Sequence, residues 1–234
     1  MKAVVLAGGL GTRLRPYTYF LPKPMLPLGY KPLLGHIIDW LVSLKITNLV
    51  ICVGYLQKVI EEYFENGADF GAQISYSRSQ KPLGTAGQLK HAEPFVDGSF
   101  LCVYGDSLYD FELKEVVKLH EKRGALATMV LMDYKTKMKY GFIDLGKDNS
   151  VLQWREKPEV SNLINVGCYI MEKEFLKYIP ENKMYGMDVA FKNALSEGET
   201  ICGIRPKGQV IDIGDKESYE KAVEAYDGEF GKIL

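Results

Sequence analysis

The stretch VVLAGGLGTRLRPYTYFLPKPMLPL, from Val4 to Leu28, decides the fold of this chain. It begins as an apolar run typical of a buried strand and then breaks into glycines at Gly8, Gly9 and Gly11. In a doubly wound sheet, ligands bind at the carboxyl ends of the strands, so the loop after the first strand is the first candidate site. Glycines in such a loop let backbone N–H groups approach a phosphate chain closely.

This loop differs from both common phosphate-binding motifs. Its glycines meet the first two positions of the dinucleotide fingerprint G-x-G-x-x-G, but Leu14 stands at the third, and the P-loop pattern is not met. The prolines that follow forbid a regular helix before about Pro32. We therefore expect a long loop in which Arg13 and Lys23 can close over a polyphosphate, with a purely structural loop as the alternative.

Composition and charge exclude several classes of protein. The chain has 234 residues, of which 47% are hydrophobic and 25% charged, and its net charge is −1. A nearly neutral chain gives no electrostatic reason to expect nucleic acid or an anionic membrane as a partner. No apolar run approaches the roughly 20 residues of a membrane span, and the N-terminus does not resemble a signal peptide. We expect a cytoplasmic protein without nucleic-acid or membrane partners.

The cysteines give no sign of a metal or redox site. Cys52, Cys102, Cys168 and Cys202 are widely separated, form no C-x-x-C pair and have no neighbouring histidine. A zinc site is therefore not expected, and the pattern is typical of reduced thiols in a cytosolic protein.

Short apolar runs alternate with helical patterns through the first two-thirds of the chain. We expect strands at 3–8, 48–54, 72–77, 99–107 and 125–132, and helices near 33–42, 57–67, 85–95 and 111–124. The strands read as almost continuous apolar runs, as in a parallel sheet covered on both faces. This rhythm predicts a doubly wound α/β sheet.

The pattern changes after about Lys135. The segments 140–146, 150–158 and 162–171 are strand-like with turns between them, which predicts a small antiparallel excursion near the sheet. Helical patterns return at 172–179 and 187–198, strands at 200–206 and 208–214, and the last helix follows. No Ser/Pro-rich linker or internal repeat divides the chain, so we expect one domain over residues 1–234.

At this point the chain resembles a known family. Residues 7–28 are similar to the signature G-x-G-T-R-[x]n-P-K-P of the sugar-1-phosphate nucleotidylyltransferases, with the glycines, Thr12-Arg13 and Pro22-Lys23-Pro24 all matching. Further segments resemble that family's motifs in the same order: PLGTAG at 82–87, YGDSL at 104–108, YGF at 140–142, REKP at 155–158, NVGCY at 165–169 and VIDIGD at 210–215. Together they cover almost the whole chain.

The resemblance implies a three-layer Rossmann-like fold, with a mixed, mostly parallel sheet, helices on both faces and the antiparallel excursion on the sugar side. It also implies transfer of a nucleoside monophosphate from an NTP to a sugar 1-phosphate, with release of pyrophosphate. Such chemistry depends on positioning and charge neutralisation and needs no covalent nucleophile. The absence of a Ser/His/Asp set is consistent with this, since His36, His91 and His120 all fall in helical patterns.

The resemblance also implies residue roles on the nucleotide side. Arg13 would hold the leaving β- and γ-phosphates, Lys23 would lie near the α-phosphate, and Asp106 would complete the catalytic set. The nucleotide-binding residues would be Leu6, Ala7, Gly8, Gly9, Gly11, Thr12, Arg13, Gly84 and Thr85. Gly87 would serve either close helix packing or approach of the base, two alternatives that the sequence leaves open.

On the sugar side, the resemblance implies that Gly141, Glu156, Lys157 and Asn165 bind the sugar phosphate. Asp106 and Asp212 each end an apolar strand, where a carboxylate is costly unless it is paired or bound to metal. We expect these two residues to share one Mg²⁺. Asp110 and Asp215 are instead expected to cap helices.

Substrate choice is less defined. The motifs are most similar to those of the branch of the family that uses GTP and mannose 1-phosphate. The alternatives are thymidylyl-, uridylyl- or cytidylyltransferases that act on glucose 1-phosphate or on another hexose or heptose 1-phosphate. Gln80 and Lys81 depart from the acidic or amide residue that the family usually carries before PLGTAG, which puts the choice of base in doubt.

Other classes remain open at this stage. One is a catalytically silent regulatory subunit that binds nucleotide sugars, and another is a nicotinamide-dependent oxidoreductase, against which Leu14 argues. Many relatives in the family continue into a C-terminal left-handed β-helix that is not seen before Leu234, so we expect a minimal catalytic domain. Homo-oligomerisation is left open.

Overall fold

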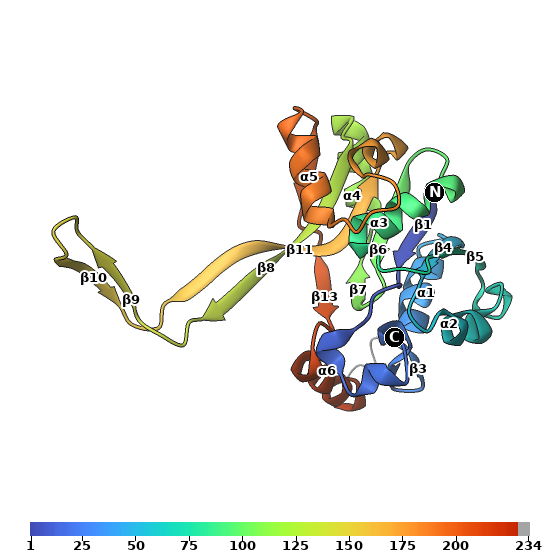
Figure 1. Cartoon of the computed structure of the whole chain (residues 1–234), viewed down its shortest axis with the longest axis horizontal. Coiled ribbons are helices and arrows are strands. Elements are labelled where there is room, and N and C mark those ends of the chain that lie inside the picture. Colours follow the sequence, from blue (N-terminus) through green and yellow to red (C-terminus); the bar gives the residue numbers. More distant parts are fainter. Residues whose placement is uncertain (229–234) are drawn as a thin grey trace.

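A seven-stranded sheet forms the frame of the computed structural model, which describes residues 1–228 (Figure 1). The strand order is β12–β8–β11–β6–β1–β4–β5. The bounds are β1 Lys2–Leu6, β4 Asn48–Val53, β5 Gln73–Arg78, β6 Phe100–Tyr104, β8 Ala127–Lys137, β11 Glu159–Met171 and β12 Ile201–Ile204. Only β11 runs antiparallel to its neighbours, so the expected mixed, mostly parallel sheet is confirmed.

Helices cover both faces of this sheet. They are α1 Leu33–Ser43, α2 Gln57–Phe64, α3 Gly84–His91, α4 Lys114–Arg123 and α5 Met187–Ser196, whereas α6 Lys216–Gly228 packs against the loop after β1. Successive side chains of a strand point to opposite faces, and β1 shows this directly. Ala3 and Val5 join the core formed with α1, α2 and α4, whereas Val4 and Leu6 join the core formed with α3 and α5. The expected layers are therefore confirmed.

The loop after β1 contains no regular helix before Leu33, as the prolines predict. It is built from short 3-10 turns at Thr12–Leu14, Tyr17–Tyr19 and Lys23–Met25, followed by the hairpin of β2, Pro27–Leu28, and β3, Lys31–Pro32. A separate apolar cluster ties this loop to the last helix: Leu14, Leu26, Leu28, Leu33, Ile213, Tyr219, Ala222 and Tyr226. Leu14, at the position of the missing glycine, is a buried anchor of that cluster.

A second ladder lies beside the main sheet. Strand β7, Ser107–Phe111, pairs antiparallel with β13, Gly208–Asp212. The expectation that Asp110 caps a helix is wrong, because Asp110 lies within β7 opposite Gln209, and α4 begins only at Lys114. The capping role expected of Asp215 is confirmed, since its Oδ1 accepts the Ser218 N–H at 2.9 Å at the start of α6.

The antiparallel excursion is a long arm rather than a segment lying against the sheet. Beyond the sheet, β8 and β11 continue as a two-stranded ladder, which ends in the hairpin of β9, Phe142–Leu145, and β10, Val151–Arg155. We call residues 132–164 the arm, and Figure 1 shows it projecting away from the body. The strands of this excursion were expected from the sequence, whereas its projection away from the sheet was not.

The helices of residues 1–228 were also compared with the requirements of a membrane span. None of them is both long enough and apolar enough to cross a bilayer.

Candidate active site

A cleft of about 200 Å³ opens at the carboxyl ends of β1 and β6. Its lining includes the predicted residues Leu6, Ala7, Gly9, Gly11, Thr12, Arg13, Lys23, Thr85 and Asp106. It also includes Pro24, Gln88, Tyr104, Gly105 and Gly214, which sequence reasoning did not select. The structure therefore brings most of the expected nucleotide residues and the expected catalytic residues into one place.

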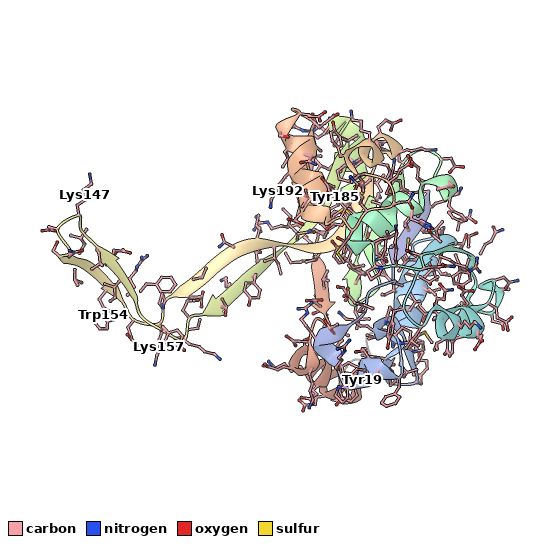
Figure 2. All side chains as sticks on the ribbon, viewed as in Figure 1. Tyr19, Lys147, Trp154, Lys157, Tyr185 and Lys192 are labelled. Atoms are coloured by element: carbon pink, nitrogen blue, oxygen red, sulfur yellow. The ribbon has the colours of Figure 1, made fainter. Side chains whose placement is uncertain are left out.

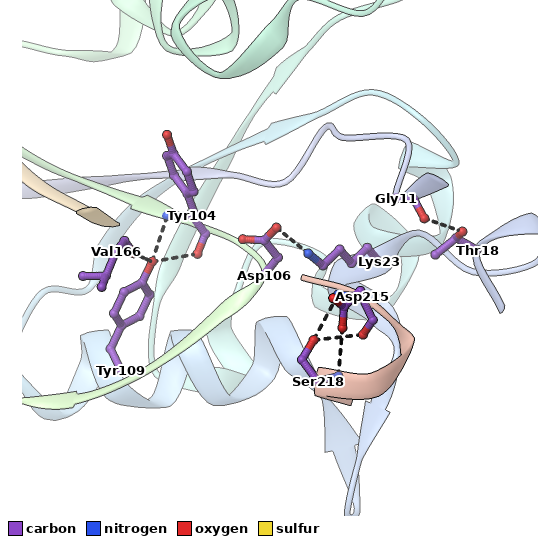
Figure 3. A network of polar contacts seen from close by, with 9 residues as sticks. All are labelled: Gly11, Thr18, Lys23, Tyr104, Asp106, Tyr109, Val166, Asp215 and Ser218. Carbon is purple, nitrogen blue, oxygen red and sulfur yellow. Dashed lines mark hydrogen bonds and ion pairs between the residues drawn. The ribbon is translucent and has the colours of Figure 1, made fainter. Parts of the chain in front are cut away.

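Lys23 and Asp106 both line the cleft, and their side chains face each other (Figure 3). The Lys23 Nζ lies 2.5 Å from the Asp106 Oδ2, and Lys23 is only 7% exposed. A 3-10 turn that follows Pro22 carries the lysine inward, while Asp106 follows the end of β6. Because a buried cation is costly without a partner, this ion pair fixes both side chains in the cleft.

Asp212 approaches Asp106 from the β7–β13 ladder. Asp212 pairs in register with Ser107, and the Ile213 N–H donates to the Asp106 carbonyl at 3.2 Å. Partial burial, and then the neighbouring Asp106 carboxylate, raise the pKa of Asp212, while Lys23 and Arg13 act in the opposite direction. Two carboxylates that disfavour each other's charge are a chemically suitable pair of ligands for a hard cation.

Arg13 borders the same carboxylate. A Cβ built on Gly214 would lie 2.8 Å from Asp212 Oδ2 and 3.4 Å from Arg13 Nη1, so both side chains adjoin this glycine. The turn that carries Arg13 is held by the Thr18 hydroxyl, which donates to the Gly11 carbonyl at 2.8 Å (Figure 3). Arg13, Lys23 and Asp106 thus line the cleft, and Asp212 adjoins it beside Gly214 without being part of the lining.

Gln88 is a residue that sequence reasoning missed. Its Oε1 accepts the Gly8 N–H at 2.8 Å, and its Nε2 donates to the Gly84 carbonyl at 3.1 Å. It therefore joins the loop after β1 to the first turn of α3, and it engages the Gly8 amide. The only available signal was its position, directly after the PLGTAG segment.

The first turn of α3 is closed by a neighbouring segment. The Ala86 and Gly87 N–H groups donate to the Tyr185 carbonyl at 3.0 and 3.2 Å, and Thr85 Oγ1 accepts the Met187 N–H at 2.9 Å. A Cβ on Gly87 would lie 2.5 Å from the Lys183 carbonyl oxygen. Close packing against this segment therefore accounts for Gly87, the first of the two alternatives left open above.

A second cleft, of about 510 Å³, lies on the other side of the loop after β1. Gly8 and Leu10 line it, whereas Gly9 and Gly11 line the first cleft. The rest of its lining follows β4 and β5: Gly54, Tyr55, Leu56, Gln57, Lys58, Val59, Ser79, Gln80, Lys81 and Pro82. The two positions at which the sequence departs from its family pattern, Gln80 and Lys81, therefore border this cleft.

Asn165 lies at the base of the arm and reaches the cleft only through tyrosines. Its Nδ2 donates to the Tyr169 hydroxyl at 2.5 Å, which lies 3.3 Å from the Tyr104 hydroxyl in the cleft lining. Its Oδ1 accepts the Gly167 N–H at 3.1 Å. Burial raises the pKa of Tyr104, so its hydroxyl remains protonated at neutral pH.

The other predicted sugar-phosphate residues lie on the arm. Figure 2 shows Trp154 and Lys157 away from the body of the molecule. The Trp154 Nε1 donates to Glu156 Oε2 at 3.1 Å, and a Cβ on Gly141 would meet the same oxygen at 2.9 Å. The structure thus keeps Gly141, Glu156 and Lys157 together, but it does not bring them into the cleft.

Among the described residues, no cysteine or histidine lines the cleft. Cys52, Cys102 and Cys168 are buried free thiols, and burial raises the pKa of all three, that of Cys52 to about 12. The histidines are in α1, α3 and α4, as expected, and none lines the cleft. No group of three or more His, Cys, Asp or Glu suited to a metal occurs within residues 1–228.

Comparison with known proteins places this site in a family. The sequence profile described as Nucleotidyl transferase matches residues 2–229. The chain belongs to this family, and its resemblance to the sugar-1-phosphate nucleotidyltransferases is confirmed by relatives at more than 30% identity.

The names of two of these relatives give different activities. A UTP–glucose-1-phosphate uridylyltransferase of Synechocystis sp. is 35% identical over 95% of this chain and 62% of its own length. A mannose-1-phosphate guanyltransferase of Kluyveromyces lactis is 33% identical over 94% of this chain and 63% of its own length. The chain thus spans about three-fifths of the length of the relatives that it matches.

The fold has close counterparts among solved structures. HddC from Yersinia pseudotuberculosis, complexed with GMP-PN, superposes with a TM-score of 0.77 at 25% identity. The superposition covers 96% of this chain and 99% of that structure.

Proposed function

We propose that the chain transfers a nucleoside monophosphate from an NTP to a sugar 1-phosphate and releases pyrophosphate. The observation that carries this proposal is the cleft that Arg13, Lys23 and Asp106 line at the carboxyl ends of β1 and β6, with the Asp212 carboxylate adjoining it beside Gly214. Two anionic substrates must meet in this reaction, so a site that concentrates cations and metal-binding carboxylates suits its main requirement.

The chemical step is a displacement at phosphorus. An oxygen of the sugar phosphate forms a bond to the α-phosphorus, and the bond from that phosphorus to the bridging oxygen breaks, with its electron pair leaving on pyrophosphate. Arg13 would hold the β- and γ-phosphates in its guanidinium fork. Lys23 would move from Asp106 to the α-phosphate and stabilise the charge that develops there.

Asp106 and Asp212 would hold a Mg²⁺ ion. The two side chains offer hard oxygen ligands, and partial burial and the neighbouring Asp106 carboxylate raise the pKa of Asp212, so a cation held between the two carboxylates would be favourable. When bound, Mg²⁺ supplies positive charge to the phosphate oxygens of the substrates. Release of Lys23 from Asp106 and binding of the metal would therefore accompany each other.

GTP and mannose 1-phosphate are the substrates we propose. The name of the Kluyveromyces relative and the GMP-PN bound to HddC support this choice. UTP and glucose 1-phosphate are a second candidate, favoured by the name of the Synechocystis relative. Gly141, Glu156, Lys157 and Asn165 would bind the sugar phosphate in either case.

The test is a matrix of ATP, GTP, CTP, UTP and dTTP against a panel of sugar 1-phosphates, with pyrophosphate release as the readout. We expect the fastest turnover with GTP and mannose 1-phosphate, and turnover only when Mg²⁺ is present. A fastest reaction with UTP and glucose 1-phosphate would select the second candidate. No pyrophosphate with any pair, while nucleotide still binds, would overturn catalysis and favour a silent binding subunit.

A further inference from the structure

Lys23 occupies one of the two carboxylates that the proposed metal site needs. Its Nζ lies 2.5 Å from Asp106 Oδ2, and the side chains of Lys23 and Asp106 are only 9% and 31% exposed. A charge-assisted hydrogen bond is strong where water competes for it weakly. A divalent cation that approaches Asp106 therefore meets a positive charge already bound to the carboxylate.

The backbone on both sides of this ion pair is held in place. The Met25 N–H donates to the Pro22 carbonyl at 2.8 Å and closes the turn that carries Lys23. On the other side, the Asp106 carbonyl accepts the Ile213 N–H at 3.2 Å. The backbone cannot separate the pair without losing these bonds. Release of Asp106 therefore requires rotation of the Lys23 side chain.

The lysine lies within reach of the loop that would hold the triphosphate. A Cβ built on Gly11 would lie 3.1 Å from the Lys23 Cβ, so the stem of the lysine packs directly against this loop. Gly9, Gly11 and Lys23 line the same cleft. The flexible stem of a lysine lets its ammonium group take several positions around one backbone site. The same ammonium can therefore bind either Asp106 or a phosphate in the cleft.

The charged groups of the site balance one another in the free chain. Arg13 and Lys23 line the cleft together with Asp106, and Arg13 and Asp212 both adjoin Gly214. A divalent cation alone would leave the two basic groups without compensation, and a triphosphate alone would do the same to the two carboxylates. An uncompensated charge in a partly buried site is costly. The site therefore favours the binding of both ligands together.

We propose that Lys23 is an internal competitor of the divalent cation. In the free chain it occupies Asp106 and weakens metal binding. When a triphosphate binds, the lysine moves to the phosphates and leaves the carboxylate to the cation. The ligand of this site is then the complex of a divalent cation with a nucleoside triphosphate, rather than either one alone. This proposal rests on the proposed function, which supplies the nucleotide and the metal.

Such competition makes the binding of the two ligands cooperative. If the cation strengthens nucleotide binding by some factor, the nucleotide must strengthen cation binding by the same factor, because the binding free energies are linked. Factors of about 5–150 are typical of such coupling. The part of the coupling that is due to Lys23 disappears when the lysine is removed, and it can be measured without turnover.

The first test measures the binding of Mn²⁺ without nucleotide. Mn²⁺ takes the same hard oxygen ligands as Mg²⁺, and its free form is counted by electron paramagnetic resonance. Lys23→Met keeps an unbranched apolar side chain and removes the charge. We expect this variant to bind Mn²⁺ about tenfold more tightly than the wild type, or more tightly still.

Arg15→Met is the matched control for the first test. Arg15 is an exposed cation of the same loop, and its guanidinium lies 4.9 Å from the centre of the Tyr19 ring. Because solvent and salt screen an exposed charge, this variant should change the affinity for Mn²⁺ by less than about twofold. A Lys23→Met variant that binds Mn²⁺ no more tightly than the wild type would overturn the proposal.

The second test approaches the ion pair from the carboxylate. Asp106→Asn releases Lys23, so we expect GTP to bind this variant more tightly than the wild type when EDTA removes divalent cations, as measured by calorimetry. Addition of Mg²⁺ should strengthen GTP binding to the wild type about tenfold or more, and to the variant much less. Asp110→Asn removes a carboxylate of β7 outside the cleft lining and should behave as the wild type. Equal GTP affinities of Asp106→Asn and the wild type in EDTA would contradict the competition.

The proposed function and the competition fail in different ways. Neither binding test contains a sugar phosphate, and UTP replaces GTP if the substrate matrix selects it. If the matrix gives no pyrophosphate with any pair, the proposed function fails, and the Mn²⁺ affinities still decide whether Lys23 competes with the cation. If the wild type is active and Lys23→Met gains no affinity for Mn²⁺, the function stands and the competition is overturned. Circular dichroism verifies that each variant is folded, and where one is not, the other decides.

Discussion

Lys23 and Asp106 neutralise each other in the cleft, and this ion pair affects both stability and catalysis. The lysine is almost completely buried, and its charge is compensated by a carboxylate at 2.5 Å. Removing one partner of such a pair leaves an uncompensated charge in the other, which is usually strongly destabilising. Stability and catalysis are therefore coupled at this residue, and a test of its role has to separate them.

Lys23→Ala should lower kcat by about 10²–10³, as does removal of other groups that stabilise transition-state charge, and should change the KM for the nucleotide much less. Steady-state kinetics at saturating sugar phosphate measure the two constants. Lys114→Ala, at an exposed position on α4, is the control for loss of a lysine. A rise in KM with kcat unchanged would contradict a transition-state role.

Asp212→Asn tests the carboxylate pair by pH. A raised pKa in the folded state means that the folded chain holds this proton more tightly than the unfolded chain does. The carboxylate therefore costs stability above its folded pKa, and the cost disappears as the pH falls below the ordinary value.

We expect the Asp212→Asn variant without metal to unfold at a slightly higher Tm than the wild type at pH 7. The gain should be less than about 1 kcal/mol, since solvent screens this partly exposed group, and it should vanish near pH 3. Mg²⁺-dependent turnover should be lost. Asp110→Asn, on the neighbouring β7, is the control, and an equal Tm change in that variant would remove the carboxylate pair as the cause.

At the scale of elements, the site is assembled by connections between loops and neighbouring elements. The β7–β13 ladder brings Asp212 beside Asp106, α6 holds the loop that carries Arg13, and Gln88 links that loop to α3. None of these three connections lies within a single motif. Each can be weakened without touching the charged residues.

Gln88→Ala should release the loop after β1 from α3. Two hydrogen bonds are lost, each worth about 0.5–1.5 kcal/mol, so we expect the KM for the NTP to rise about tenfold with a smaller effect on kcat. Gln57→Ala, on the first turn of α2 beside the second cleft, is the control for loss of a glutamine. An unchanged KM would show that the loop holds its shape without Gln88.

Tyr219→Phe tests the connection to the last helix. The Tyr219 hydroxyl donates to the Pro27 carbonyl at 2.6 Å, and the ring packs in the cluster that contains Leu14. Loss of the hydroxyl alone should lower the free energy of unfolding by about 0.5–1.5 kcal/mol, measured by urea unfolding. Tyr63→Phe, an exposed tyrosine of α2, should change it by much less.

At the scale of the whole molecule, ligand binding should stabilise the fold because the cleft joins strands, α3 and the loop after β1. A nucleotide at 100 times its Kd adds about 2.7 kcal/mol, which corresponds to a Tm rise of about 5–10 °C for a chain of this length. We expect GTP with Mg²⁺ to give this rise and UTP to give less. A larger rise with UTP would favour the uridylyl alternative, and Lys114→Ala should respond as the wild type does.

The sequence by itself determined the central sheet and the nature of the first loop. Apolar runs separated by helical patterns are local signals, and a proline excludes helix wherever it stands, so the strands, α1 and the irregular segment before Leu33 were all predictable. The phosphate-loop residues that line the cleft were found for the same reason, because they lie next to one another in the chain.

Only the tertiary structure decided what depends on pairing between distant segments. The β7–β13 ladder, the contacts of Gln88 and the packing of Gly87 against Lys183 join residues far apart in sequence, and no local pattern records them. The direction of the arm is the clearest case. Its strands are visible in the sequence, but the register shift and the buried Tyr109 at its base aim them outward, because a strand's direction is set by what it pairs with and packs against.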